Sequence, residues 1–145
     1  MGDIAKDIKS NFSNEWVKAL INIQYTAHWF DAIGMTLLQP FNISIQQYNI
    51  LRILKGAGKP LTVNSVKERM VQKSPNTTRL MDKLCEKKLI ERMRCDNDRR
   101  VVYVAIVEKG LQLLEKISLE SMENEMKSIT EEEARTLNQI LDKIR

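Results

Sequence analysis

Charged side chains of both signs gather in one short stretch of this 145-residue chain. Residues 95–104 read CDNDRRVVYV, so two acids and two arginines directly precede a run of β-branched and aromatic residues. Guanidinium groups at a chain reversal can bind phosphates, and a neighbouring carboxylate can hold one of them by a bidentate pair. Binding of a polyanion is therefore the first chemistry to consider, with Arg100 as the main ligand and Asp98 as its support. For Arg99, a phosphate contact and an exposed ion pair of little energetic value are both open.

The sequence offers little for metal binding or catalysis. His28 is the only histidine, and Cys85 and Cys95 are the only cysteines, whereas a structural zinc site needs about four Cys, His or acidic ligands. No serine or cysteine has a base near it in sequence, and Asp96 and Asp98 are accounted for by a turn and an arginine partner. We therefore expect no metal, no cofactor and no enzymatic activity.

Cys95 leaves a redox function open as an alternative. A cysteine beside several cations can have a lowered pKa, which is the condition for a redox-sensing thiol. Four cations are close to it in sequence: Lys87, Lys88, Arg92 and Arg94. Since a free cytosolic cysteine is more often inert, the sequence does not decide whether Cys85 or Cys95 is redox active.

The basic residues are concentrated in the middle of the chain. Residues 62–104 contain 11 Lys or Arg and 6 Asp or Glu, a net charge of +5, whereas the remainder contains 12 and 13, a net charge of −1. A local excess of this kind is typical of a surface that binds a polyanion. A solvated charged face would have the same composition. The secondary structure that positions the charges must therefore distinguish a polyanion-binding surface from a merely solvated one.

Two runs with strand character flank the charged stretch. Residues 89–95 and 101–106 are separated by DNDRR, and the second run is almost wholly β-branched or aromatic. Asp96 and Asn97 are residue types that favour a bend. The pattern predicts a β-hairpin with the charges at its tip.

Two short helices are predicted directly before the hairpin. Thr62 is expected to cap a helix over residues 63–70, and Ser74 to cap a second helix with Pro75 at its first position, where a missing N–H costs nothing. Such a pair forms a helix-turn-helix, whose second helix enters the DNA major groove. With a hairpin behind it, the arrangement predicts a winged helix.

The second helix is expected to separate buried from DNA-reading side chains. At about 100° per residue, Thr77 falls on the inward arc, while Asn76, Arg79 and Lys83 share a neighbouring stripe. Arginine and asparagine pair with guanine and adenine edges, so Arg79 and Asn76 are the predicted base readers. The predicted phosphate ligands are Ser74, Thr78 and Lys83, and Arg100 is expected to enter the minor groove.

Longer helices are predicted on either side of these elements. Apolar residues recur at spacings of three and four over residues 10–38 and 107–127. Capping boxes are expected to begin two more helices. The paired residues are Ser44 with Gln47 and Thr130 with Glu133.

In this order the elements resemble the MarR family of transcriptional regulators over nearly the whole chain. The most specific stretch is KLIERMRCDNDRRVVYVAIVEKG, which is similar to the family's wing signature of Asp, any residue, Arg, a strand, Leu-Thr and a later Gly. Asp98 and Arg100 match this signature. Ile106 and Val107 replace the Leu-Thr, so the hydroxyl that would cap the following helix is absent, at a local cost of about 1 kcal/mol.

The resemblance implies a mainly α fold with a small β-hairpin wing. It also implies one domain over residues 1–145, in which residues 44–106 form the winged helix DNA-binding lobe. Residues 10–38 and 107–145 would then join two copies as an obligate homodimer. The implied function is binding of a pseudo-palindromic double-stranded DNA operator and repression of transcription until a small ligand or an oxidant loosens the complex.

Aromatic residues near the N-terminus raise the question of an effector. The family resemblance implies that a small aromatic molecule could bind beside the first helix, and an aromatic-lined crevice with one histidine would suit it. The candidate lining is Trp16, Tyr25, His28 and Trp29. Aromatic side chains on an apolar helical stripe are more often dimer core, and both interpretations stay open.

The sequence also leaves open a function in protein binding. A winged helix can also bind a protein, in which case the basic segment would contact an acidic partner without any operator palindrome. The N-terminal stretch MGDIAKDIKSNF lacks the pattern of a signal peptide, and no segment approaches the roughly 18 apolar residues of a membrane span. We therefore expect a cytoplasmic protein with no membrane partner.

Overall fold

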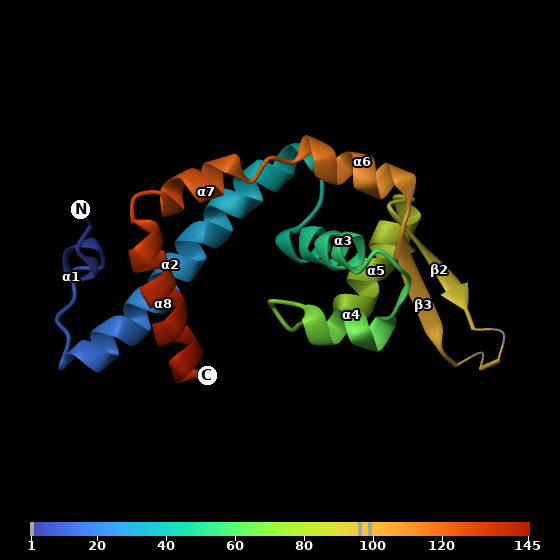
Figure 1. Cartoon of the computed structure of the whole chain (residues 1–145). Helices are drawn as coiled ribbons and strands as arrows, with labels where there is room; N and C mark the ends of the chain where they lie inside the picture. The colour runs from blue at the N-terminus through green and yellow to red at the C-terminus, as the bar shows by residue number, and fades with distance from the viewer. Residues whose placement is uncertain (1, 96, 99) are drawn as a thin grey trace. The chain divides into compact units, whose positions relative to one another are not determined.

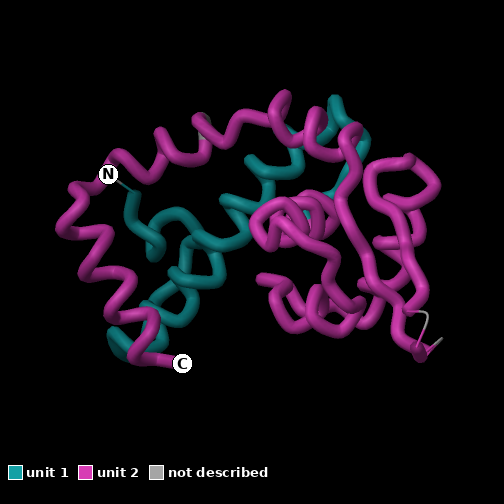
Figure 2. Tube along the Cα trace, turned by 45° about the vertical axis from the view of Figure 1, so that its right-hand side comes forward, with its two compact units in different colours: residues 1–45 teal, residues 46–145 magenta. Residues whose placement is uncertain are grey.

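The computed structural model describes residues 2–95, 97–98 and 100–145. It divides into two compact units, residues 1–45 and 46–145, which Figure 2 shows in different colours. Asp96 and Arg99 lie outside the described residues. In the described part of the chain, no helix is long and apolar enough to cross a membrane.

The first unit is built around one long helix. It contains α1 (Ile4–Asp7), α2 (Glu15–Leu38) and a 3₁₀ turn at Gln39–Phe41. The prediction that the long helix begins near residue 10 is wrong, because the side chain of Asn14 accepts a hydrogen bond from the N–H of Val17 at 2.9 Å and caps the helix there. Its end at Leu38 agrees with the expected effect of Pro40.

The three helices of the predicted DNA-binding lobe come next in the chain (Figure 1): α3 (Ile45–Ala57), α4 (Val63–Arg69) and α5 (Thr77–Glu86). Gly58 follows α3 with φ of 63°, a left-handed conformation that ends a helix at low cost for glycine. Thr62 caps α4 as predicted, since its hydroxyl accepts from the N–H of Ser65 at 3.1 Å.

A three-stranded antiparallel sheet supports the hairpin. Its strands are β1 (Leu61–Thr62), β2 (Ile90–Arg94) and β3 (Val102–Ile106), in the order β1-β3-β2. The hairpin of β2 and β3 confirms the predicted wing, whereas β1 was not predicted because two residues are too few to show a period. The fold is mainly α with a small sheet, as expected.

The core of the lobe lies where α3, α4 and α5 meet the sheet. Its fully buried side chains are almost all aliphatic, and Thr77 joins them at 1% exposure. A close-packed core of this kind fixes the orientation of α5 relative to the sheet. The other fully buried residues are Ile50, Leu51, Leu54, Val66, Met81, Leu84 and Val104.

Three helices follow the sheet: α6 (Glu108–Lys116), α7 (Glu120–Met126) and α8 (Glu131–Ile144). The prediction of one helix over residues 107–127 is wrong. Ile117 is buried with an extended ψ of 106°, and the hydroxyl of Ser118 accepts from the N–H of Glu120 at 3.2 Å, so a new helix starts there. The capping box that begins α8 is confirmed.

The start of α6 packs closely against the corner between α5 and β2. Gly110 is buried, and a Cβ at this position would lie only 2.3 Å from the carbonyl oxygen of Leu89. That oxygen also accepts a hydrogen bond from the N–H of Val107 at 3.2 Å. The ammonium of Lys109 donates to the carbonyl of Lys87 at 2.9 Å, at the C-terminal end of α5. Val107 precedes α6 without a side-chain cap, as expected from the missing hydroxyl.

Candidate nucleic-acid interface

Helix α5 presents its predicted reading residues to solvent. Thr77, Met81 and Leu84 are buried, whereas Asn76, just before the helix, and Arg79 and Lys83 are exposed. The predicted separation of the two faces, including the buried position of Thr77, is therefore confirmed. Thr78 is exposed as well, and Ser74 is half-buried.

The N-terminal end of α5 differs from the prediction that Ser74 is its cap. The helix begins at Thr77, with Asn76 at the N-cap position and no side-chain capping bond. The Ser74 hydroxyl instead accepts from the N–H of Asn76 at 3.2 Å, and the Thr77 hydroxyl donates to the Ser74 carbonyl at 2.8 Å. These short-range bonds form a turn before the helix, so Pro75 lies in the turn and not in the helix. In the bonds of the described residues the Ser74 hydroxyl acts only as an acceptor, so its proton could be donated to an acceptor such as a phosphate oxygen.

The wing tip is held by a backbone contact. The carboxylate of Asp98 accepts from the N–H of Arg100 at 2.9 Å, and the N–H of Val101 donates to the Asp98 carbonyl at 3.0 Å. The expected bidentate pair between the two side chains is not among the ion pairs of the described residues. Asp98 thus shapes the turn, and its aspartate type suits this role because a short carboxylate reaches the N–H two residues on. The predicted roles of Arg99 and of Asp96 concern residues outside the described part.

An ion pair joins α5 to the wing. Arg92 on β2 lies 2.6 Å from the carboxylate of Asp82, and its guanidinium donates to the carbonyl of Thr78 at 3.4 Å. Arg92 pairs across the sheet with the buried Val104, which places its side chain on the face of the sheet toward the helices. Both partners of the ion pair stay about a third to a half exposed, so its main effect is to orient α5 and the wing relative to one another.

A groove runs between α5 and the wing. It has a volume of about 440 Å³ and is lined from α5 by Thr78, from β2 by Arg92 and from the wing by Arg100. Thr62, Val63, Asn64, Val101 and Val102 complete its lining. The sequence predicted Thr78 and Arg100 as separate contacts, and the structure brings them to one groove. Arg92 was missed as a site residue. Its signal was the period-two spacing from the buried Ile90, which puts both on one face of β2.

The two cysteines are free and half-buried. Burial raises the pKa of the Cys85 thiol; the nearby Arg92 lowers it, while Asp82 and Glu86 raise it further. A raised pKa keeps this thiol protonated and unreactive near neutral pH. The redox hypothesis for Cys95 stays a prediction. Among the described residues, no cluster of His, Cys, Asp or Glu could hold a metal ion.

The aromatic candidates for an effector pocket lie along α2 in the first unit. Trp16 is 85% exposed, and Tyr25, His28 and Trp29 are exposed as well. The rings of Trp29 and Phe30 meet edge to face with centroids 5.0 Å apart. These positions leave the choice between an effector pocket and a dimer interface open.

The fold and the interface define a winged helix-turn-helix protein, and comparison with known proteins agrees. Residues 43–102 match the model of the MarR family. The chain is 28% identical to the HTH-type transcriptional regulator PecS of Dickeya dadantii over 110 residues, which are 72% of this chain and 66% of PecS. The chain spans about half to two thirds of the length of the curated relatives PecS and YhbI of Bacillus subtilis.

Solved structures of known regulators have a similar fold. A mutant MarR from Escherichia coli, crystallised in complex with operator DNA, superposes with a TM-score of 0.80 at 25% identity, covering 93% of this chain and 99% of that chain. The organohalide-sensing regulator RdhR, in its 2,4-dichlorophenol-bound form, has the same fold with a TM-score of 0.81 at 22% identity, covering 91% and 80%. This chain therefore resembles the MarR family, in sequence over residues 43–102 and in fold over most of its length. The curated and solved relatives named here are described as regulators and not as enzymes, in agreement with the expectation from the sequence.

Proposed function

We propose that this protein is a sequence-specific DNA-binding transcriptional regulator that acts as a homodimeric repressor. The observation that carries the proposal is the tie between α5 and the wing through Arg92 and Asp82. It orients an exposed set of base-reading and phosphate-binding residue types toward one side of the lobe. These residues are Asn76, Thr78, Arg79, Lys83 and Arg100, with Ser74 at the turn and Arg99 as a further candidate.

The apolar surface of the long helices supports a homodimer. Helix α8 is amphipathic, yet it buries no residue in the single chain, and its Leu137, Ile140 and Ile144 are exposed. On α2, Trp16 and Leu20 are also exposed. Contiguous exposed apolar surfaces are normally covered by a partner. A second copy of the chain would cover the apolar residues of α8 and those of α2. Light scattering should therefore give twice the mass of the chain.

A small aromatic effector is the proposed signal for release. The support is the resemblance to the MarR family together with Trp16, Tyr25, His28 and Trp29 on α2, whose exposed rings could line a pocket once a dimer forms. A thermal-shift screen of small phenols and metabolites tests this part independently of DNA binding. A cytoplasmic location follows from the proposed role on DNA.

Selection of bound duplexes from random DNA tests the main proposal. Two-fold symmetry predicts an inverted repeat whose half-sites are about one helical turn, or roughly 10 base pairs, apart. Enrichment of such a repeat would support the proposal. Failure to enrich any sequence, combined with specific binding of an acidic protein, would refute it in favour of a protein-interaction module.

A further inference from the structure

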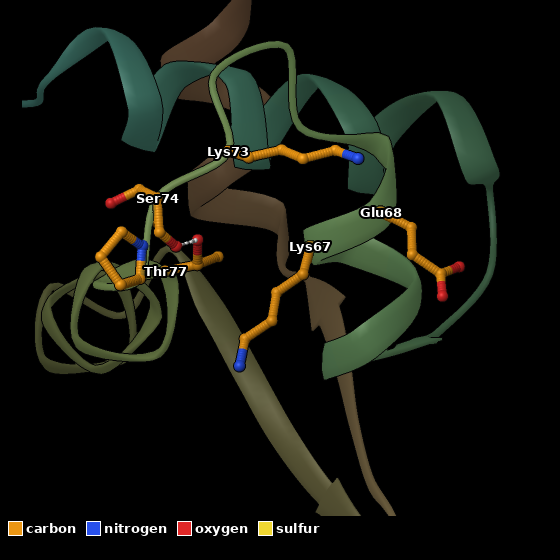
Figure 3. A pocket seen from close by; sticks show the side chains of 6 residues that line it. Lys67, Glu68, Lys73, Ser74 and Thr77 are labelled. Carbon is orange, nitrogen blue, oxygen red and sulfur yellow. Dashed lines mark hydrogen bonds between the residues drawn. The ribbon is translucent and has the colours of Figure 1, made fainter.

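A second groove lies at the turn between α4 and α5. It has a volume of about 440 Å³, and Figure 3 shows the side chains that line it. Two of them, Lys67 on α4 and Lys73 in the turn, are cationic, and neither was among the DNA ligands predicted from the sequence. The remaining lining residues are Glu68, Ser74, Pro75 and Thr77.

The turn that carries Lys73 is anchored to α3. The N–H of Val71 donates to the side chain of Asn49 at 3.0 Å, and the side-chain amide of Gln46 donates to that of Gln72 at 3.1 Å. These bonds hold the backbone on the N-terminal side of Lys73. Its ammonium group is therefore presented from a fixed point, which reduces the entropy lost when an anion binds.

No ion pair among the described residues involves either cation of this groove, Lys67 or Lys73. In Figure 3 the carboxylate of Glu68 is directed away from the α5 side of the groove. Lys67 is half-buried and Lys73 is exposed, so the stem of Lys67 lies along the protein while its ammonium reaches solvent.

The two ammonium groups are spread along the groove and do not converge on one point. Figure 3 shows Lys73 extending toward the side of Glu68 and Lys67 extending in a different direction, toward the side where Ser74 and Thr77 lie. A single free anion is best bound by groups that converge on it, whereas a spread pair of cations suits successive charges of a polymer. We propose that Lys67 and Lys73 bind consecutive phosphates of the DNA strand that passes the N-terminal end of α5. This rests on the proposed function and adds two backbone contacts to it.

The position of the groove favours DNA as the polymer. Backbone phosphates run along both edges of the major groove, so a strand must pass the N-terminal end of a helix that enters it. Ser74 lines the same groove, and in the bonds of the described residues its hydroxyl acts as an acceptor, so its proton can be donated to a phosphate oxygen. Lys67 and Lys73 then fix the register of α5 on the duplex without reading sequence.

The test removes each charge while keeping the stem, in Lys67→Gln and Lys73→Gln. One lost phosphate contact lowers the slope of log K against log salt by about 0.9, which corresponds to about an eightfold loss of affinity near 0.1 M salt. We expect this loss to be equal on the selected operator and on unrelated duplexes, and the double variant to lose about twice the slope. Lys55→Gln is the matched control, because Lys55 lines a different cavity with Ala105 and Leu111.

Three results would overturn the inference. The inference would be refuted if the wild type binds its operator and both variants keep its affinity and its slope of log K against log salt. The proposed function would then remain intact. An equal loss in the Lys55 variant would show a general effect of net charge. Saturable binding of inorganic phosphate alone at micromolar concentration, abolished in both variants, would identify a free-anion site. A wild type that binds no duplex would instead refute the proposed function. Unchanged melting temperatures are expected for all variants, and the two single variants check one another against a folding defect.

Discussion

Gly110 permits a close approach of α6 to the residue that precedes β2, and Gly110→Ala should destabilise the protein. An added Cβ would lie 2.3 Å from the carbonyl oxygen of Leu89 and 2.7 Å from Cγ1 of Ile106, where ordinary contact begins at 3.4 Å. Neither neighbour can yield easily, because Leu89 is buried and its carbonyl is hydrogen-bonded to Val107. The backbone at this corner must therefore move by roughly 1 Å, a form of overpacking.

Two opposing effects set the change in the free energy of unfolding that Gly110→Ala causes. Overpacking costs about 1–3 kcal/mol, and the clash with a backbone atom puts Gly110→Ala at the upper end. The better helix propensity of alanine returns at most about 1 kcal/mol. The net loss is about 2 kcal/mol, which lowers the melting temperature by roughly 4–8 °C for a chain of this size.

Thermal and urea unfolding followed by circular dichroism measure this loss. The protein concentration must be the same for all variants, because the stability of the proposed dimer would depend on it. The matched control is Gly56→Ala on α3, where a Cβ would meet nothing within 4 Å, so unchanged or slightly higher stability is expected. If Gly110→Ala were as stable as Gly56→Ala, the tight packing of α6 against Leu89 would be refuted.

Three further predictions concern the interface and one helix cap. Arg100→Ala is expected to weaken binding to any operator by more than about tenfold without changing thermal stability, because the guanidinium would enter the minor groove; equal affinity in a fluorescence anisotropy titration would exclude that role. Arg79→Ala should relax sequence preference, whereas Lys83→Ala should lower affinity evenly and reduce the salt slope by about one; wild-type behaviour of both variants would contradict the docking of α5. The N–H and hydroxyl of Thr130 donate to the Glu133 carboxylate and lower its pKa. The stabilisation of α8 by this cap is therefore fully present at pH values above the ordinary pKa of glutamate. It is lost as the pH falls through the lowered pKa of Glu133. Thr130→Ala removes the hydroxyl bond and keeps the N–H, so an NMR titration should show the pKa of Glu133 rising only part of the way to its ordinary value, and an unchanged midpoint would argue against the hydroxyl bond.

The elements whose ends are set by nearby residues could be predicted from the sequence. Thr62 and Thr130 cap the helices that they were expected to cap, because a cap bond joins residues only two or three apart. The hairpin of β2 and β3 was predicted from its β-branched run and turn residues. Two helix starts were wrong by a few residues, at Asn14 and Asn76, since several residues in each stretch could serve as a cap.

The candidate site was predicted in its parts but not in its connections. The exposed stripe of Asn76, Arg79 and Lys83 follows from helical periodicity alone. The ion pair of Asp82 with Arg92 does not, because the pair depends on how α5 packs against the sheet. The same holds for Lys67 and Lys73, which come from different elements and line one groove only after the turn has folded.

The sequence by itself determined the class of fold, the basic segment and the face of α5 that meets solvent, since each depends on residue type and on periods of a few residues. Only the tertiary structure decided that Arg92 ties the wing to α5, that Asp98 holds the backbone of Arg100, and that Gly110 must lack a side chain. The reason is physical. Side-chain contacts between elements depend on packing distances and on the path of each turn, and local periodicity carries no information about either.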